Sequence, residues 1–343
     1  MAESSNKNLT DEIPEPSIEN PFDISEQLSK ININTPAESP ITNPIDITQE
    51  SPTSETDADN SNYDFVLQLT TDGKNKMRLA ISALKNTEFN PSKMGLMRVT
   101  KAGFSITVKS TIDPTNEKDY VFGYLRMRAA DLDHFYCQET VSKVVPLRDV
   151  LRVLKAANFE SRAVIYGVQG SNQLSFDFDH LDVDGRTIDQ TLHVNLIDDI
   201  NSEYENFPNV LYEYKETITA ASLWKFVVGI LRRPRVPSDH SVKMEIKTNR
   251  VIMEVGEAPH YHRIREPAMT YEVSWTWRHW RSLAKALCKA EFGCIYLVNV
   301  PAQSVMLKLK LSELGDVVYL YSAEFTCNSK DPRLNQGLYR TIS

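Results

Sequence analysis

One pattern of secondary structure recurs four times along this chain, and it restricts the fold more than any other feature of the sequence. Each occurrence is a short strand, an amphipathic helix and then several strands, with helices predicted over 74–85, 146–157, 220–233 and 277–290. The second helix is typical, because Pro146 suits the first turn of a helix. Its apolar residues have the spacing of one helix face, at Leu147, Val150, Leu151 and Leu154. The recurrence predicts an α+β fold of two similar domains, each with two helices packed on antiparallel sheets.

The first 62 residues differ in composition from the rest of the chain. They hold thirteen of the 46 acidic residues but only two of the 38 basic ones, and they contain no glycine. Such a segment buries too little apolar surface to offset the entropy of ordering, so we expect it to be disordered. We predict an acidic leader over 1–62, a first domain over 63–197, a connecting loop over 198–210, a second domain over 211–327 and a tail over 328–343.

The four predicted helices carry most of the positive charge of the folded part. Their net charges are +4, +2, +3 and +4, whereas the remainder of 63–343 sums to −10. On a helical wheel the basic residues form stripes beside or opposite the apolar faces. A single basic stripe is ordinary solvated surface, but four stripes against an acidic remainder favour a polyanion as the partner. The candidate phosphate-contacting residues are Lys74, Arg78, Lys85, Arg148, Arg152, Lys155, Lys225, Arg232, Arg233, Arg278, Arg281, Lys285 and Lys289.

Several classes of protein lack support in the sequence. The most apolar run, near 223–231, is interrupted by Lys225, so no membrane span is expected. The four cysteines show no Cys-x-x-Cys spacing, which favours a reducing, intracellular compartment. Phosphate-binding glycine motifs are absent, and we identify no catalytic residue, metal ligand or cofactor site. A non-enzymatic protein is therefore predicted.

The arrangement resembles the sliding-clamp (PCNA) fold over about 63–327. The stretch from Met306 to Asp316, followed by Val318–Tyr321, is similar to the last hairpin of a clamp. The segment from Val145 to Ala157 is similar to the second clamp helix and its preceding strand, and the acidic segment from Ile197 to Pro208 to the interdomain connecting loop. Replicative-clamp motifs are replaced at Ile112–Asn116 and at Leu320–Glu324. Phe135–Glu139 resembles the subunits of the heterotrimeric DNA-damage checkpoint clamp instead.

The resemblance implies a function and a set of partners. It implies a subunit of a ring that encircles double-stranded DNA without reading its sequence and tethers other proteins in checkpoint signalling and repair. Two other clamp subunits and a clamp loader would be partners, in the nucleus or at a site of viral DNA replication. The ring would close through edge strands, 191–197 and 260–265. Peptide-motif partners would dock at the connector, on Asp198, Asp199, Ile200, Tyr204 and Phe207.

Three alternatives remain open at the level of sequence. A replicative or viral polymerase processivity factor, homotrimeric or monomeric, has the same basic helices. A monomeric nucleic-acid-binding accessory protein can share the fold and form no ring. An enzyme can assemble its site from residues that are distant in the sequence.

Overall fold

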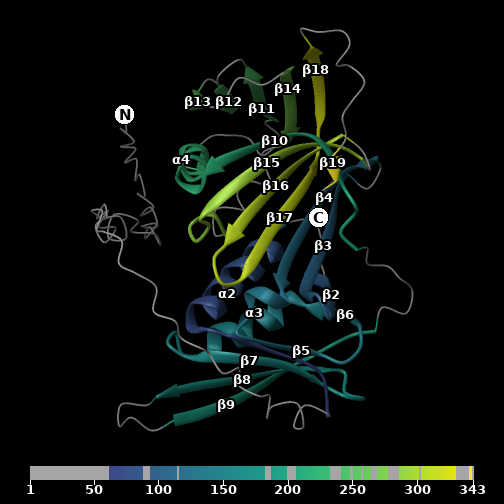
Figure 1. The fold of residues 1–343 in the computed structure, drawn as a ribbon, viewed down its shortest axis with the longest axis vertical. Helices are drawn as coiled ribbons and strands as arrows, with labels where there is room; N and C mark the ends of the chain where they lie inside the picture. The colour runs from purple at the N-terminus through teal and green to yellow at the C-terminus, as the bar shows by residue number, and fades with distance from the viewer. Residues whose placement is uncertain are drawn as a thin grey trace, which may run out of the picture. The chain divides into compact units, whose positions relative to one another are not determined.

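The computed structural model describes residues 62–87, 93–113, 116–181, 187–198, 206–231, 241–247, 250–255, 258–263, 269–276, 286–300, 303–329 and 340–341. All of them belong to the unit Ser54–Ser343 (Figure 1). The predicted leader lies outside the described residues except for Asn62, and the first strand starts at Tyr63.

Antiparallel strands make up most of this unit, and α-helices cover parts of it. The first part contains β1 (Tyr63–Leu69), α2 (Thr71–Lys85), β2 (Met94–Thr100), β3 (Gly103–Asp113), β4 (Asn116–Arg128), the 3-10 helix η1 (Ala129–Asp131), β5 (His134–Cys137), β6 (Val141–Pro146), α3 (Leu147–Ala156), β7 (Arg162–Val168), β8 (Gln173–Leu181) and β9 (Thr187–Asn195). The second part contains β10 (Leu211–Thr219), α4 (Ala220–Leu231), β11 (Ser241–Lys247), β12 (Arg250–Val255), β13 (Ala258–Arg263), β14 (Met269–Thr276), β15 (Phe292–Val300), β16 (Ser304–Leu311), β17 (Gly315–Ser322), β18 (Glu324–Ser329) and β19 (Arg340–Thr341). The predicted α+β class is confirmed.

The strands form three sheets. The N-terminal sheet has the order β5-β1-β7-β8-β9, and the C-terminal sheet has the order β13-β12-β11-β14-β18. The third sheet, which we call the central sheet, has the order β19-β10-β15-β16-β17-β4-β3-β2-β6. Strands from both parts of the chain therefore share one hydrogen-bonded sheet.

The strand order repeats within the chain. In the first half, β1-β7-β8-β9 are neighbours in that order, and in the second half β10-β15-β16-β17 are neighbours in the same order. A second run of four strands matches as well, because β4-β3-β2-β6 corresponds to β13-β12-β11-β14. In each half a helix follows the first strand, α2 after β1 and α4 after β10. The two halves of the chain, each of which holds two of the four predicted occurrences, thus share one topology.

The two halves are joined by the antiparallel pair β17·β4, with a register from Asp316↔Arg126 to Tyr321↔Val121. In the topological repeat, β17 corresponds to β9 and β4 corresponds to β13. Both β9 and β13 are edge strands, of the N-terminal and the C-terminal sheet respectively. The prediction that 191–197 and 260–265 lie at sheet edges is confirmed for the parts that fall in these strands.

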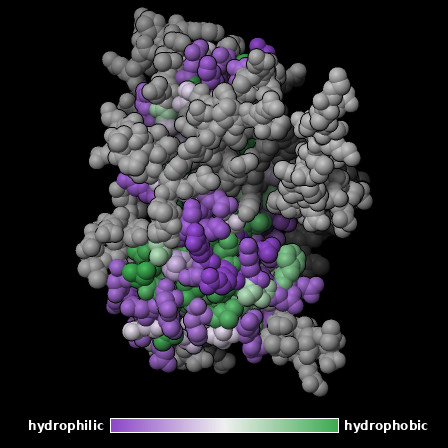
Figure 2. Space-filling view, turned by 180° about the vertical axis from the view of Figure 1, so that it is seen from behind, coloured by the Kyte–Doolittle hydropathy of each residue, from purple (hydrophilic) through white to green (hydrophobic). Residues whose placement is uncertain are grey.

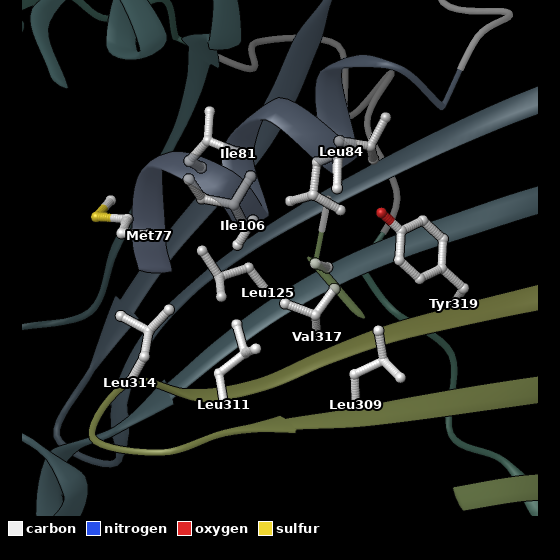
Figure 3. Close-up of a cluster of buried hydrophobic side chains, with 14 of the residues drawn as sticks. Met77, Ile81, Leu84, Ile106, Leu125, Leu309, Leu311, Leu314, Val317 and Tyr319 are labelled. Carbon is white, nitrogen blue, oxygen red and sulfur yellow. The ribbon is translucent and has the colours of Figure 1, made fainter. Parts of the chain in front are cut away.

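The junction between the halves is covered by α2. Met77, Ile81 and Leu84 lie on the face of α2 that points toward the central sheet (Figure 3). They are fully buried, as are neighbours from β3, β4, β16, β17 and the turn between β16 and β17, namely Ile106, Leu125, Leu309, Leu311, Leu314, Val317 and Tyr319. Because α2 contacts strands of both halves, the apolar core is continuous across the junction. α3 packs beside α2, between the N-terminal and central sheets (Figure 1).

Several elements differ from the sequence-based expectation. Pro146 is the last residue of β6 and the N-cap of α3, so the helix begins one residue later than predicted. Between β4 and α3 the chain forms three short elements, η1, β5 and β6. Most of the predicted fourth helix lies outside the described residues, and Ala286 and Leu287 are helical. Within the described part of the chain, no helix is both long and apolar enough to cross a bilayer.

Candidate nucleic-acid interface

α3 presents all of its predicted cations to solvent. Leu147, Val150, Leu151 and Leu154 are buried, and the intervening Arg148, Arg152 and Lys155 are exposed. The Arg152 guanidinium lies 3.1 Å from the Asp149 carboxylate one turn earlier, so its charge is partly offset. Lys155 is in the last turn, where a cation also interacts favourably with the helix dipole. This helix therefore has the basic solvent face that the sequence predicts.

On α2 the predicted cations are less exposed. Arg78 is half-buried, and its guanidinium carbon lies 6.0 Å from the centre of the Phe159 ring, in the turn after α3. Lys85 is half-buried in the last turn of the helix. Since α2 and α3 pack side by side, Arg78 and the turn after α3 belong to one continuous surface.

Lys74 corrects the predicted stripe. Only 1% of the residue is exposed, and its ammonium donates hydrogen bonds to Ser161 Oγ at 2.8 Å, to the Phe159 carbonyl at 3.3 Å and to the Asn158 carbonyl. Burial, with a smaller contribution from the neighbouring Arg78, lowers the pKa of the Lys74 ammonium. The turn after α3 folds over the start of α2 and uses this group, so Lys74 is not available for a DNA phosphate.

Lys76, which a helical wheel places off the basic stripe of α2, is also buried. Its Nζ lies 2.5 Å from Asp72 and donates a hydrogen bond of 2.8 Å to the Ser312 carbonyl in the turn between β16 and β17. This contact ties α2 to the second half of the chain. The two lysines in the first turns of α2 therefore stabilise the fold, and the solvent-facing cations begin at Arg78.

The predicted stripes of the second half are described only in part. Lys225 is exposed on α4, and Lys289 is exposed just after the helical residues Ala286 and Leu287. The other predicted cations, Arg232, Arg233, Arg278, Arg281 and Lys285, lie outside the described residues.

The predicted connector is described at its two ends. Asp198 is exposed and forms an ion pair with Lys143, whereas Asp199, Ile200 and Tyr204 lie outside the described residues. Phe207 is half-buried, and its ring stacks on Tyr124 with centroids 4.9 Å apart and meets the edge of Phe122 at 6.1 Å. The connector therefore ends on the face of the central sheet opposite the helices. Tyr124 and Phe122 were not among the predicted residues, although the alternation of aromatic residues at 120, 122 and 124 indicates an aromatic strand face.

Among the described residues, the exposed cations of α3 are the candidate binding groups. No three or more His, Cys, Asp or Glu side chains among the described residues form a group suited to a metal ion. Hydrophilic residues predominate over the described part of the face in Figure 2, with apolar residues in scattered patches. Exposed lysines and arginines beside an apolar helix face can neutralise phosphates without reading bases. No protein-family model matches this chain, and no curated protein is similar enough to it to count as a match.

Proposed function

We propose that this protein is a non-catalytic subunit of a ring-shaped sliding clamp that encircles duplex DNA and tethers partner proteins. The observation that carries the proposal is the pairing of β17 with β4 inside the chain. The strands that correspond to these two, β9 and β13, are edge strands, each with one side open. If β9 of one subunit adds antiparallel to β13 of the next, each contact between subunits repeats the junction already present within the subunit. A head-to-tail contact of this kind generates a ring when its rotation closes.

Contact with DNA is proposed for the exposed cations of the helices. Arg148, Arg152 and Lys155 on α3, with Arg78 beside them, supply point charges on a rigid surface. The free energy of such contacts comes largely from the release of counterions from DNA, so affinity is independent of base sequence and falls with salt. Lys225 and Lys289 are the described cations that would contribute from the second half.

Within this class we propose a subunit of the heterotrimeric DNA-damage checkpoint clamp, acting in the nucleus after opening by a clamp loader. The segment Phe135–Glu139, which includes most of β5, and the departures at Ile112–Asn116 and Leu320–Glu324 support this choice over a replicative clamp. The proposal predicts that the chain needs different subunits to complete its ring. A ring formed by this chain alone would favour a processivity factor instead.

Ring closure is testable through the open edge of β9. Along an edge strand, N–H groups point alternately to the paired neighbour and to the open side. Of Gln190→Pro and Thr191→Pro, one therefore removes an N–H from the open side and leaves the pairing with β8 intact. We expect that variant to keep the wild-type thermal midpoint and to lose assembly, measured by sedimentation of the 39.1 kDa chain alone and with its co-purified partners.

The companion proline variant is the control, because it breaks the β8·β9 pair and should lower the thermal midpoint. Wild-type assembly by the well-folded variant would contradict ring closure through β9. So would a wild-type chain that sediments as a monomer with every protein that co-purifies with it.

A further inference from the structure

A pocket of about 220 Å³ lies on the central sheet, and it contains two arginines. Its polar lining comes from Arg98 and Thr100 on β2, Ser105 on β3, and Tyr124 and Arg126 on β4. The flanking residues Met97, Val99, Leu125 and Met127 are fully buried in the core on the helix side. Because side chains alternate along a strand, Arg98 and Arg126 point to the opposite side, away from the helices.

The strand register places the two arginines symmetrically. Ser105 pairs with Arg98 on one side and with Arg126 on the other, so the three residues form one row across three strands. Neighbouring strands are about 4.8 Å apart, which puts the Arg98 and Arg126 backbones roughly 10 Å apart. The Ser105 side chain between them is small, and its hydroxyl donates a hydrogen bond of 3.2 Å to the Arg98 carbonyl of the neighbouring strand. This leaves space between the two arginine side chains. Two guanidinium groups can therefore approach one group from opposite sides.

Neither guanidinium is neutralised by a carboxylate of the described residues. The hydrogen bond of Arg98 is a long one, 3.5 Å, to Asn206 Oδ1. Asp316 pairs with Arg126 in the strand register, but its carboxylate lies 3.1 Å from Lys308 Nζ. Elsewhere Arg128 lies 2.9 Å from Asp131, and Arg152 3.1 Å from Asp149. Within the described part of the protein, neither guanidinium of the pocket thus forms an ion pair.

The pocket adjoins the end of the predicted connector. Tyr124 lines it and stacks on Phe207, and Asn206, which accepts the hydrogen bond from Arg98, directly precedes Phe207. A peptide that docks at this end of the connector would pass the two arginines. DNA held by the helices would not reach them, because the arginines are on the opposite face of the sheet.

We propose that this pocket binds the phosphoryl group of a phosphorylated serine or threonine in a partner peptide that docks at the connector. A phosphoryl group carries nearly two negative charges and three acceptor oxygens, and the planar guanidinium binds such groups with two parallel hydrogen bonds. A single carboxylate matches one arginine but not two. The inference rests on the proposed function only in placing partner docking at the connector, and phosphorylation of a partner would then control its recruitment.

The test measures binding of the full chain to degenerate peptides fixed at phosphoserine, at serine or at glutamate, by fluorescence anisotropy. We expect the phosphoserine set to bind at least tenfold more tightly than either of the others. Arg98→Gln and Arg126→Gln should each weaken phosphopeptide binding roughly tenfold, since each removes a charge-assisted contact. Arg98→Lys should restore only part of the loss, because an ammonium lacks the planar fork. Lys215→Gln, at an exposed cation on β10 outside the pocket, is the matched control and should bind as wild type.

Equal binding of the three peptide sets, or binding of inorganic phosphate without any phosphopeptide preference, would overturn the proposal. So would an equal loss in the Lys215→Gln control. Retention of the assembled protein on circular duplex DNA separates this inference from the proposed function. The arginine variants should leave retention unchanged, and a loss of retention would assign the two arginines to DNA instead. Phosphopeptide binding by a chain that never assembles on DNA would leave the pocket intact and overturn the clamp.

Discussion

Lys74 shows how the surroundings of a charged side chain decide its role. The turn Asn158–Ser161 is fixed by short-range bonds, including Asn158 Oδ1 accepting from the Glu160 N–H at 3.2 Å, and by Thr71 Oγ1 donating to the Glu160 carbonyl at 2.9 Å. The Lys74 ammonium adds hydrogen bonds to the Asn158 and Phe159 carbonyls and to Ser161 Oγ of the same turn. A helical wheel places Lys74 on the basic stripe of its helix, but only the tertiary structure brings the turn after α3 over it. The ammonium of Lys74 thus binds the turn after α3 and is not part of the exposed basic surface.

We expect Lys74→Met to lower the free energy of unfolding by about 1–3 kcal/mol, because it leaves buried acceptors in the turn without their donor. Lys155→Met, at an exposed residue of α3, should change it by less than about 0.5 kcal/mol. Urea denaturation of the two variants measures the difference. Equal costs would show that the contacts of Lys74 do not contribute to stability.

At the scale of elements, local pattern predicted the helices better than the strands. The spacing of Leu147, Val150, Leu151 and Leu154 defines the face of α3 without any knowledge of its neighbours. By contrast, the division of 131–146 into η1, β5 and β6 depends on which sheet each piece joins, because β5 pairs with β1 and β6 pairs with β2. The register of Arg98, Ser105 and Arg126 is likewise a tertiary property. For this reason the sequence indicated the basic helices and missed the arginine pocket.

The turn between β16 and β17 depends on a glycine at its end. Gly315 has a φ of +130°, and a Cβ added there would lie 2.0 Å from the Arg126 carbonyl oxygen on β4. Gly315→Ala should therefore lower the free energy of unfolding by at least about 3 kcal/mol, since the strained backbone and the clash with β4 act together. Gly170→Ala is the matched control, because Gly170 has a φ of +71° but no atom within 4 Å of the added Cβ.

The control variant should cost only about 1–2 kcal/mol, the ordinary penalty of a left-handed backbone for a residue with a Cβ. Thermal and urea unfolding of the two alanine variants provide the comparison. Similar losses would mean that β4 moves aside without cost and that the junction β17·β4 is loosely packed.

For the whole molecule, the sequence predicted the α+β class, the internal repeat and the positions of two edge strands. It did not predict that strands of both halves form one sheet, because no local pattern specifies that β17 pairs with β4 rather than with another strand. For the candidate site, too, the sequence predicted local features and not the contacts between distant segments. Amphipathic spacing identified the exposed cations of α3, whereas the burial of Lys74 and the stacking of Phe207 on Tyr124 depend on contacts between distant segments.

Charge reversal on α3 tests the proposed DNA contact. Each phosphate neutralised adds roughly 0.9 to the slope of log affinity against log salt, so Arg148→Glu with Lys155→Glu should flatten the slope by about two units. Stability should change little, because both residues are exposed. Lys215→Glu with Lys243→Glu, two exposed cations on β10 and β11, provides a matched pair of reversals away from the helices.

DNA binding of the assembled complex across a salt series, for both double variants, gives the two slopes. We expect the β10 and β11 pair to leave the slope near that of the wild type. Equal slopes for the helix pair and the strand pair would identify the basic stripe of α3 as ordinary solvated surface and would remove the physical basis of the DNA contact.

The pairing of β17 with β4 also has a consequence for synthesis on the ribosome. β4 emerges early, but its partner is among the last strands of the fold to be translated. Until then β4 is an open strand edge, and the apolar face of α2 lacks Leu309, Leu311 and Val317, which complete its cover. Exposed edges and apolar faces of nascent chains are sites of mispairing and of chaperone binding. The first half of the chain therefore reaches its native packing only after β17 has been translated.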